Sequence, residues 1–161
     1  MPRCRRVHPQ GARRLGILSR IAGRKTYLDT NVFIYTLEGF PGIEDALKEL
    51  FKAIDAGAVQ TVSSELSLAE VLIKPIQNKN VQHQAIYEAA IRSRKRLEVV
   101  PVSRSVLLEA ARLRGTTNLR PPDTIHAATA TLSGCTGFFS NDGRIKRPSL
   151  ELILLREFIT P

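Results

Sequence analysis

The sequence has no tryptophan, only one methionine and two cysteines, and no long run of apolar residues. No apolar stretch approaches the roughly 20 residues that a membrane-spanning helix needs, so we expect no membrane association of that kind. Cys4 and Cys135 lie far apart and have no neighbours at metal-site spacing. This pattern argues against a disulfide framework and a structural zinc site, and it predicts a cytoplasmic protein.

Acidic residues are missing from the first 24 positions, which hold seven arginines. The whole chain carries a net charge of +9, whereas residues 25–161 hold 17 basic and 15 acidic residues and are nearly balanced. Residues 1–24 also lack the apolar core of a secretory signal. We expect a basic arm over 1–24 that is disordered or belongs to an extended start, followed by one domain over 25–161. Organellar targeting and non-specific phosphate binding are alternative roles for this arm.

Apolar periodicity and turn residues predict strands that alternate with helices along the domain. We expect strands at 26–28, 58–62, 97–102, 136–139 and 150–155, and helices directly after Asp29 and at about 43–57, 64–73, 79–96, 103–113 and 121–132. Such alternation predicts an α/β fold with a mainly parallel sheet. Positive charge suits a helix C-terminus, so we interpret the basic residues at 92–96 as the solvated end of a helix.

Four acidic residues fall where this topology would bring them together. Asp29 follows the first strand, and Asp142 follows the strand at 136–139. Asp123 opens the helix before that strand, and Glu70 lies inside the helix after the second strand. Because ligands bind beyond the carboxyl ends of parallel strands, we expect these acids to share one cleft.

Each acid also has a local interpretation. Asp29 is a good helix cap, Asp123 suits a first helical turn after two prolines, and Asp142 belongs to an Asn-Asp-Gly turn. Glu70 fits a capping box with Ser67. None of these local roles requires a catalytic site.

Together the four acids have a shared electrostatic consequence. Two like charges about 4 Å apart cost on the order of 4 kcal/mol at an effective dielectric near 20. Such a cluster is tolerated when it holds a cation, or when some members stay protonated. An all-oxygen set of ligands suits Mg²⁺ or Mn²⁺ rather than zinc.

The local contexts of these acids carry a family resemblance. Leu28–Val32 (LDTNV), the internal Glu70, Pro122–Ala128 (PDTIHAA) and Ser140–Asp142 (SND) resemble the PIN-domain nucleases, above all the VapC-type toxins of bacterial and archaeal toxin–antitoxin pairs. The match covers roughly residues 26–158. The arm before Lys25 is the main departure, since these proteins usually begin almost at the first strand.

The resemblance implies a three-layer PIN-like fold, a homodimer, Mg²⁺-dependent hydrolysis of RNA phosphodiester bonds, and an antitoxin partner that blocks the acidic cleft. It implies that the catalytic and metal-holding acids are Asp29, Glu70, Asp123 and Asp142. Asn31 and Ser140 match positions that orient these acids. Ser140 stands where the family often has threonine, a change that keeps the hydroxyl.

Basic residues near Asp123 and Asp142 are candidates for gripping an RNA backbone: Arg120, Arg144, Lys146 and Arg147. Surface solubility is the alternative explanation for these cations. His126 lies three residues after Asp123, on a neighbouring part of the same helix face. We interpret His126 as a residue that packs or bonds locally and do not count it as catalytic.

Other functions fit parts of the same pattern. A phosphoryl-transfer enzyme or receiver-like switch also places an aspartate and Mg²⁺ at strand ends, but a haloacid-dehalogenase-type phosphatase would need a second aspartate where Asn31 stands. A PIN-like nuclease that is not a toxin and a nucleic-acid-binding module without catalysis are the further alternatives.

Overall fold

The central sheet contains five parallel strands in the order β3-β2-β1-β4-β5 in the computed structural model, which describes residues 16–159. The strands are β1 (Lys25–Leu28), β2 (Gln60–Ser64), β3 (Leu97–Val100), β4 (Gly137–Ser140) and β5 (Glu151–Leu154). The seven α-helices among the described residues are α1 (Ile17–Ile21), α2 (Thr30–Glu38), α3 (Glu44–Ala56), α4 (Glu65–Gln77), α5 (Val81–Ala90), α6 (Arg104–Thr116) and α7 (Pro121–Leu132). A short 3₁₀ helix, η1 (Leu155–Phe158), follows β5. The predicted parallel α/β architecture is therefore confirmed.

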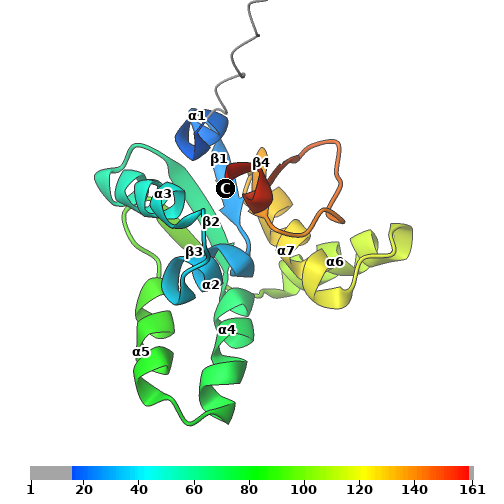
Figure 1. Ribbon diagram of the computed structural model, residues 1–161. Coiled ribbons are helices and arrows are strands. Elements are labelled where there is room, and N and C mark those ends of the chain that lie inside the picture. Colours follow the sequence, from blue (N-terminus) through cyan, green and yellow to red (C-terminus); the bar gives the residue numbers. More distant parts are fainter. Residues whose placement is uncertain (1–15, 160–161) are drawn as a thin grey trace, which may run out of the picture.

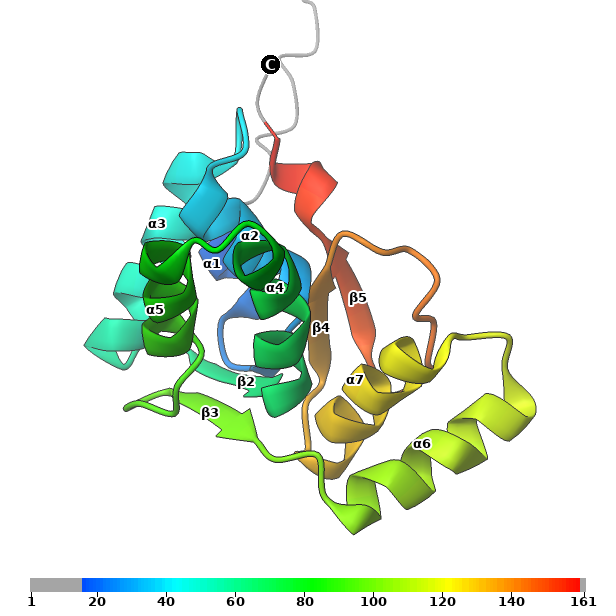
Figure 2. The same cartoon turned by 90° about the horizontal axis from the view of Figure 1, so that it is seen from below.

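Helices cover both faces of the sheet, which makes three layers (Figures 1 and 2). Successive strand residues point to opposite faces, and the two hydrophobic clusters follow that alternation. Leu28 and Phe139 pack with α1 to α5, whereas Tyr27 and Phe138 pack with α6 and α7. Both pairs are in register between β1 and β4 and fully buried. The central strands are thus fixed from both sides.

The second strand begins at Gln60, two residues later than the sequence predicts, because the residues after α3 still bond to that helix. Gly57 adopts a left-handed conformation with φ 82°, and its N–H bonds the carbonyls of Ala53 and Ile54. The N–H of Ala58 also donates to Ala53, at 2.9 Å. Ala58 therefore belongs to the end of α3 rather than to β2.

The long helix predicted over 79–96 is wrong in its second half. Asn80 caps α5 by accepting from the N–H of His83 at 3.0 Å, and the helix ends at Ala90. The hydroxyl of Ser93 accepts from the N–H of Val99 at 2.9 Å and so directs the chain into β3. The basic residues at 92–96 are therefore part of a turn and are not the end of a helix.

The predicted arm over 1–24 is wrong for the part that the structure describes. Ile17 and Ile21 of α1 are each 1% exposed and belong to the main hydrophobic cluster. The ordered domain therefore begins before Lys25. Residues 1–15, which the same prediction covers, lie outside the described residues. No helix in the described part of the chain is both long and apolar enough to cross a membrane.

Candidate active site

The predicted acids come from four elements around the carboxyl-terminal edge of the sheet. Asp29 ends β1 and caps α2, where its Oδ1 accepts from the N–H of Thr30 at 2.8 Å. Asp142 follows β4, the parallel neighbour of β1. Asp123 lies in the first turn of α7, and Glu70 lies in the middle of α4.

Asp29 and Asp142 are joined through Ser140. The Ser140 hydroxyl donates to Oδ2 of Asp29 and accepts from the N–H of Asp142 at 2.9 Å. Burial raises the pKa of Asp29, which is 7% exposed, while nearby His126 and the hydrogen bonds from Ser140 and Thr30 act in the opposite direction. Ser140 therefore bonds to two of the predicted acids, and its role in orienting them for catalysis stays a prediction.

His126 connects Glu70 to the buried side of the cluster. Its Nε2 lies 2.9 Å from Oε2 of Glu70 and 3.9 Å from Oδ1 of Asp29. Its Nδ1 lies 2.6 Å from the hydroxyl of Tyr27, and the Thr30 hydroxyl donates to the same Glu70 oxygen. The sequence predicts that His126 packs or bonds locally, whereas its partners are an acid of the candidate site 56 positions away and a buried tyrosine 99 positions away.

Burial and charge act against each other at this pair. Burial lowers the pKa of His126. The hydrogen bond to Glu70 and the charges of Asp29, Glu70 and Asp123 raise it by more than burial lowers it, so the pKa lies above its ordinary value. Burial raises the pKa of Glu70, but the His126 and Thr30 hydrogen bonds outweigh this and lower it overall. The protein therefore favours a charged pair at this position.

The capping-box interpretation of Ser67 and Glu70 is wrong. Ser64 caps α4, because its hydroxyl accepts from the N–H of Leu66 at 3.1 Å. The buried Ser67 hydroxyl instead lies 3.2 Å from the hydroxyls of both Thr30 and Ser63. Glu70 is thus left to face Thr30 and His126.

Arg144 links the other two acids. Its Nη2 lies 3.4 Å from Oδ2 of Asp123, and its Nε donates to both carboxylate oxygens of Asp142 at 2.9 Å. The hydrogen bond from Arg144 holds the pKa of Asp142 below its usual range. Asp123 also keeps its local role, since its Oδ2 accepts from the N–H of Arg120 at 3.3 Å. The cluster thus contains two cationic partners, His126 on one side and Arg144 on the other.

The four acids form a linked cluster, but their carboxylates are turned toward His126 and Arg144. Among residues 16–159, no group of three or more His, Cys, Asp or Glu side chains is arranged to hold a metal ion. The side chain of Arg144 is 51% exposed, whereas those of Asp123 and Asp142 are 19% and 23% exposed. The guanidinium therefore lies on the solvent side of these acids.

The remaining predicted residues have different surroundings. Asn31 is half-buried and has no hydrogen bond to any of the four acids in the described part of the chain, so its orienting role stays a prediction. Arg120 lies close enough to lower the pKa of Asp142. Lys146 is exposed, whereas Nε and Nη1 of Arg147 are buried without a hydrogen-bond partner among the described residues.

Sequence reasoning missed Thr30 and Tyr27 as members of the site. Thr30 reads as an ordinary cap residue, and Tyr27 as a strand residue of the core. The only local indication that Thr30 belongs to the site is its position next to Asp29. The partners of Tyr27 and Thr30 lie 99 and 40 positions away, and only the fold brings them together.

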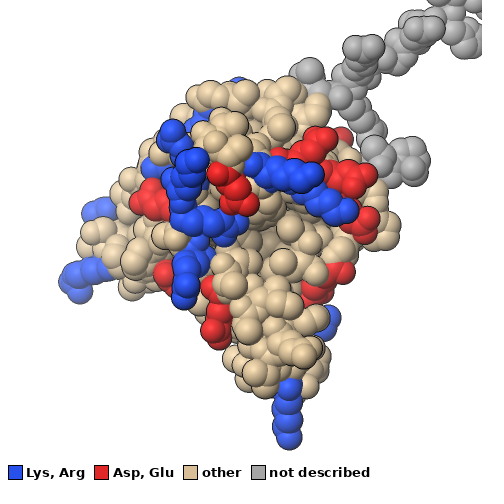
Figure 3. Space-filling model, turned by 90° about the vertical axis from the view of Figure 1, so that its left-hand side faces the viewer, with Lys and Arg blue, Asp and Glu red and all other residues tan. Residues whose placement is uncertain are grey.

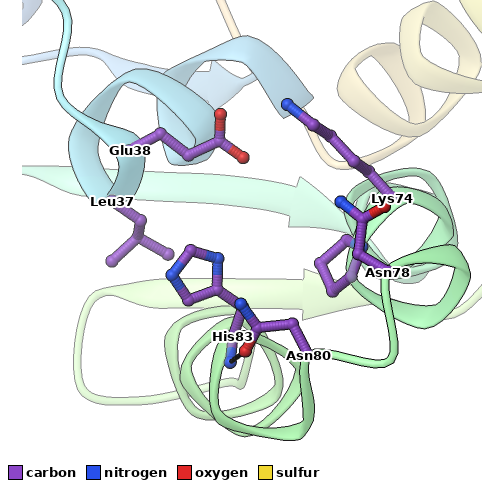
Figure 4. A pocket seen from close by; sticks show the side chains of 7 residues that line it. Leu37, Glu38, Lys74, Asn78, Asn80 and His83 are labelled. Carbon is purple, nitrogen blue, oxygen red and sulfur yellow. Dashed lines mark hydrogen bonds between the residues drawn. The ribbon is translucent and has the colours of Figure 1, made fainter.

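A separate polar cavity of ≈ 350 Å³ lies between the end of α2 and the α4–α5 pair. Figure 4 shows Glu38 and Lys74 on opposite sides of this cavity, with His83 between α2 and the loop that carries Asn78. Tyr87 donates to Glu38 at 2.8 Å. None of the four acids lines this cavity, so it is distinct from the candidate active site.

Comparisons with known proteins agree with this architecture. One similar structure is a chain of DNA-bound VapBC from Salmonella typhimurium, with a TM-score of 0.64 and 20% identity. The alignment covers 82% of this chain and 98% of that chain. VapBC2 from Rickettsia felis, bound to a promoter DNA fragment, gives a TM-score of 0.63 at 20% identity, with 80% of this chain and 97% of that chain covered. These identities show a shared fold.

A third similar structure is a toxin that cleaves the sarcin–ricin loop. It is VapC20 from Mycobacterium tuberculosis, which has a TM-score of 0.58 and 16% identity, and the alignment covers 74% of this chain and 91% of that one. No curated protein sequence matches this chain significantly. The family model of the PIN domain matches residues 26–150, a span that contains all four acids. The chain therefore belongs to the PIN-domain family.

Proposed function

We propose that this protein is a Mg²⁺-dependent endoribonuclease of the cytoplasm and the toxin of a type II toxin–antitoxin pair. The observation that supports this most is the linked cluster at the carboxyl-terminal edge of the sheet. Asp29, Glu70, Asp123 and Asp142 come from four elements, yet two cations and one serine connect all of them. In parallel α/β sheets this edge is the usual position of a ligand.

The chemistry of the donor groups fits a hard divalent cation. The four candidate ligands are carboxylates, which suit Mg²⁺ or Mn²⁺. Asp123 and Asp142 already attract a guanidinium, so these acids accept positive charge between them. Binding of a metal ion by this pair requires the half-exposed Arg144 side chain to move away from them.

In the proposed mechanism, Asp29, Asp123 and Asp142 hold the ion, and Glu70 assists directly or through water. A bound ion would activate a water for in-line attack and stabilise charge on the leaving 3′ oxygen. Ser140 keeps Asp29 in place, and His126 does the same for Glu70. These bonds orient the carboxylates before any ligand arrives.

RNA binding is assigned to cations at the rim of the cluster. Arg120 and Lys146 are exposed and have no acidic ion-pair partner among the described residues, so their charges are available for phosphates, whereas Nε and Nη1 of Arg147 are buried. Arg144 would join them once it leaves Asp123 and Asp142. Single-stranded RNA suits an open edge that does not read duplex grooves.

Protein partners are the second part of the proposal. The α4–α5 pair extends away from the sheet (Figure 1) and exposes large apolar side chains: Ile73, Ile76, Val81 and Ile86. A further set on α6 and α7 is exposed as well: Leu107, Leu108 and Leu132. Exposed apolar groups of this kind favour protein–protein contacts. We assign them to an antitoxin and to a second copy of the chain.

Replacing Asp29 with asparagine tests the catalytic proposal. Asp29→Asn keeps the shape and the bond from Thr30 but removes the charge. Metal ions contribute several kcal/mol of charge stabilisation, and each 1.36 kcal/mol is tenfold in rate. We therefore expect Mg²⁺-dependent cleavage of a labelled RNA to fall by about 10²-fold or more.

The control is Asp45→Asn, which removes an exposed carboxylate on α3. This variant should cleave as the wild type does, and both variants should show cooperative thermal unfolding. Full activity in folded Asp29→Asn would exclude Asp29 from the mechanism. Cleavage that survives EDTA would exclude the metal. Growth arrest on expression, relieved by a small upstream gene, tests the toxin role separately.

A further inference from the structure

Lys and Arg side chains gather at the amino-terminal edge of the sheet, opposite the acid cluster. They come from the start of β1 and from the turn between α5 and β3: Arg24, Lys25, Arg92, Arg94, Lys95 and Arg96. We call this group the basic edge. Figure 3, which views the left-hand side of Figure 1, shows Lys and Arg side chains concentrated on one part of that face.

The turn that carries most of these cations is held by several hydrogen bonds. Arg94 and Leu97 exchange backbone bonds of 2.8 and 2.7 Å. The carbonyl of Arg96 accepts from both the N–H and the hydroxyl of Thr61, at 2.8 and 2.9 Å. Arg94 donates to the carbonyl of Ala90, the last residue of α5, at 2.9 Å, so the end of this helix accounts for Arg94 but makes no such bond to Lys95 or Arg96. The turn therefore fixes the backbone positions from which these side chains extend.

Half of the basic edge has an acidic partner and half has none. Arg94 pairs with Asp55 at 3.1 Å and Lys25 with Glu98 at 3.2 Å, while Arg24 pairs with Glu151. The other three cations, which are exposed, make no ion pair among residues 16–159: Arg92, Lys95 and Arg96. An excess of three positive charges is therefore left for a ligand.

Two adjoining cavities lie among these side chains. Their volumes are ≈ 410 Å³ and ≈ 260 Å³, and both are lined by Gln60 and Arg96. At Gly57, which borders the smaller cavity, an added Cβ would lie 3.4 Å from Cε of Lys95. The Lys95 and Arg96 side chains thus lie over Gly57, beside the cavity. Arg96 occupies the boundary between the two hollows.

The sequence carries further positive charge on the amino-terminal side of α1. Residues 1–15 hold five arginines and no acid, and they join the described chain at Gly16. Only α1 separates that junction from Gly23 and Arg24, which line the smaller cavity.

We propose that the basic edge binds the phosphate backbone of RNA as a second contact, away from the bond that is cut. The identification of the polyanion as RNA rests on the proposed function. The contact and the acid cluster lie at opposite ends of β1, a four-residue strand about 13 Å long. A single strand that reaches around the sheet would be held at one end and cut at the other.

The experiment measures fluorescence anisotropy of a labelled oligoribonucleotide in EDTA, so that binding is separated from cleavage. Lys95→Gln/Arg96→Gln removes two unpaired charges of the basic edge. Arg104→Gln/Arg112→Gln, on exposed positions of α6, removes the same net charge elsewhere. The salt slope for single strands is about −0.7 per phosphate contact. We expect the basic-edge variant to lose about 1.4 units of slope and at least fivefold in affinity.

The α6 variant should keep both the slope and the affinity of the wild type. Equal effects of the two double variants would overturn the proposal, because net charge alone would then explain binding. Tighter binding of a DNA duplex of equal length would overturn the assignment to RNA. If the double variant does not unfold cooperatively, Arg96→Gln alone replaces it, and the expected change in salt slope is then half as large. Because binding is measured in EDTA and cleavage is measured separately with Mg²⁺, failure of the proposed cleavage and failure of this contact are distinguishable.

Discussion

At the scale of single residues, the charge of the acid cluster depends on His126. Its ring bonds a hydroxyl from β1 and a carboxylate from α4, and Asp29 is within 4 Å of the same nitrogen. When the ring is charged, both nitrogens donate, one to Tyr27 and one to Glu70. The imidazolium therefore stabilises two acids that would otherwise repel each other.

This arrangement predicts a pH-dependent stability in the metal-free protein. The folded-state pKa of His126 lies above its ordinary value of 6.5. Its contribution is therefore fully present below pH 6.5 and is lost as the pH rises through the higher folded-state pKa. We expect the difference in unfolding free energy between wild type and His126→Gln to shrink between pH 6 and pH 9.

Urea unfolding in EDTA measures this difference. Glu70 and Asp142 have lowered folded-state pKa values, so their contributions are present above their ordinary values of 4.5 and 3.8 and are lost on acidification. Work above pH 6 therefore excludes the titrations of Glu70 and Asp142, but not that of Asp29, whose pKa is raised by burial. Removing the ring also leaves the buried Tyr27 hydroxyl without this partner, which costs about 1–3 kcal/mol at every pH. A difference that grows with pH would contradict the prediction.

The positions of the clustered acids could be predicted from the sequence, whereas most of their side-chain partners could not. Asp29, Asp123 and Asp142 lie beside strand ends or helix starts, where turn and cap residues are recognisable within a few positions. Arg144 is two residues from Asp142, yet its contact with Asp123 depends on how α7 packs beside β4. Side-chain pairing across elements is set by packing geometry, which no local pattern encodes.

At the scale of elements, helices with strong local signals were predicted closely, whereas boundaries set by tertiary contacts were not. The helix after Pro121 and the cap at Ser103 are marked by their own residues. In contrast, the predicted helix over 79–96 is interrupted after Ala90, where Ser93 bonds Val99 of β3. α1 was not predicted because a five-residue helix is too short for its apolar periodicity to be told from that of an apolar loop.

Helix α1 also gives a stability prediction. Ile17 and Ile21 lie in the main core, and truncating a buried isoleucine to alanine costs about 2–5 kcal/mol. For a domain of this size 1 kcal/mol corresponds to about 2–4 °C, so Ile17→Ala should lower Tm by at least about 4 °C. Deletion of residues 1–24 should destabilise more, because it removes both isoleucines.

Deletion of residues 1–15 is the matched control for this prediction. It removes five arginines but leaves α1 intact. We expect this shorter chain to keep the melting temperature of the full chain in differential scanning calorimetry. If deleting 1–15 and deleting 1–24 had the same effect, the packing of α1 would not contribute to stability.

At the scale of the whole molecule, opposite charges lie at the two ends of the same parallel strands. The start of β1 carries the basic edge, and its end carries Asp29. A phosphate backbone is attracted to the first end and repelled by the second unless a cation neutralises the acids. Divalent cation binding and RNA access to the acid cluster are therefore expected to be coupled.

This coupling predicts how the melting temperature responds to Mg²⁺. A ligand at 100 times its Kd stabilises the folded state by about 2.7 kcal/mol, which corresponds to roughly 5–11 °C for this chain length. EDTA should reverse the shift, and Asp142→Asn should abolish most of it. In the proposed site Arg144 would compete with the ion for Asp123 and Asp142, so Arg144→Gln should shift the midpoint of the Mg²⁺ titration to lower concentration.

Lys146→Gln separates direct competition from a general change in charge. Lys146 is exposed and two residues from Arg144, and it has no ion pair in the described part of the chain. Removing its charge alters the field around the acids without vacating the space between Asp123 and Asp142. Its Mg²⁺ titration should therefore match that of the wild type within twofold. If Arg144→Gln and Lys146→Gln had the same titration midpoint, the guanidinium would not occupy the place of the metal ion. If Asp142→Asn kept the full Mg²⁺-induced shift in melting temperature, the ion would bind elsewhere.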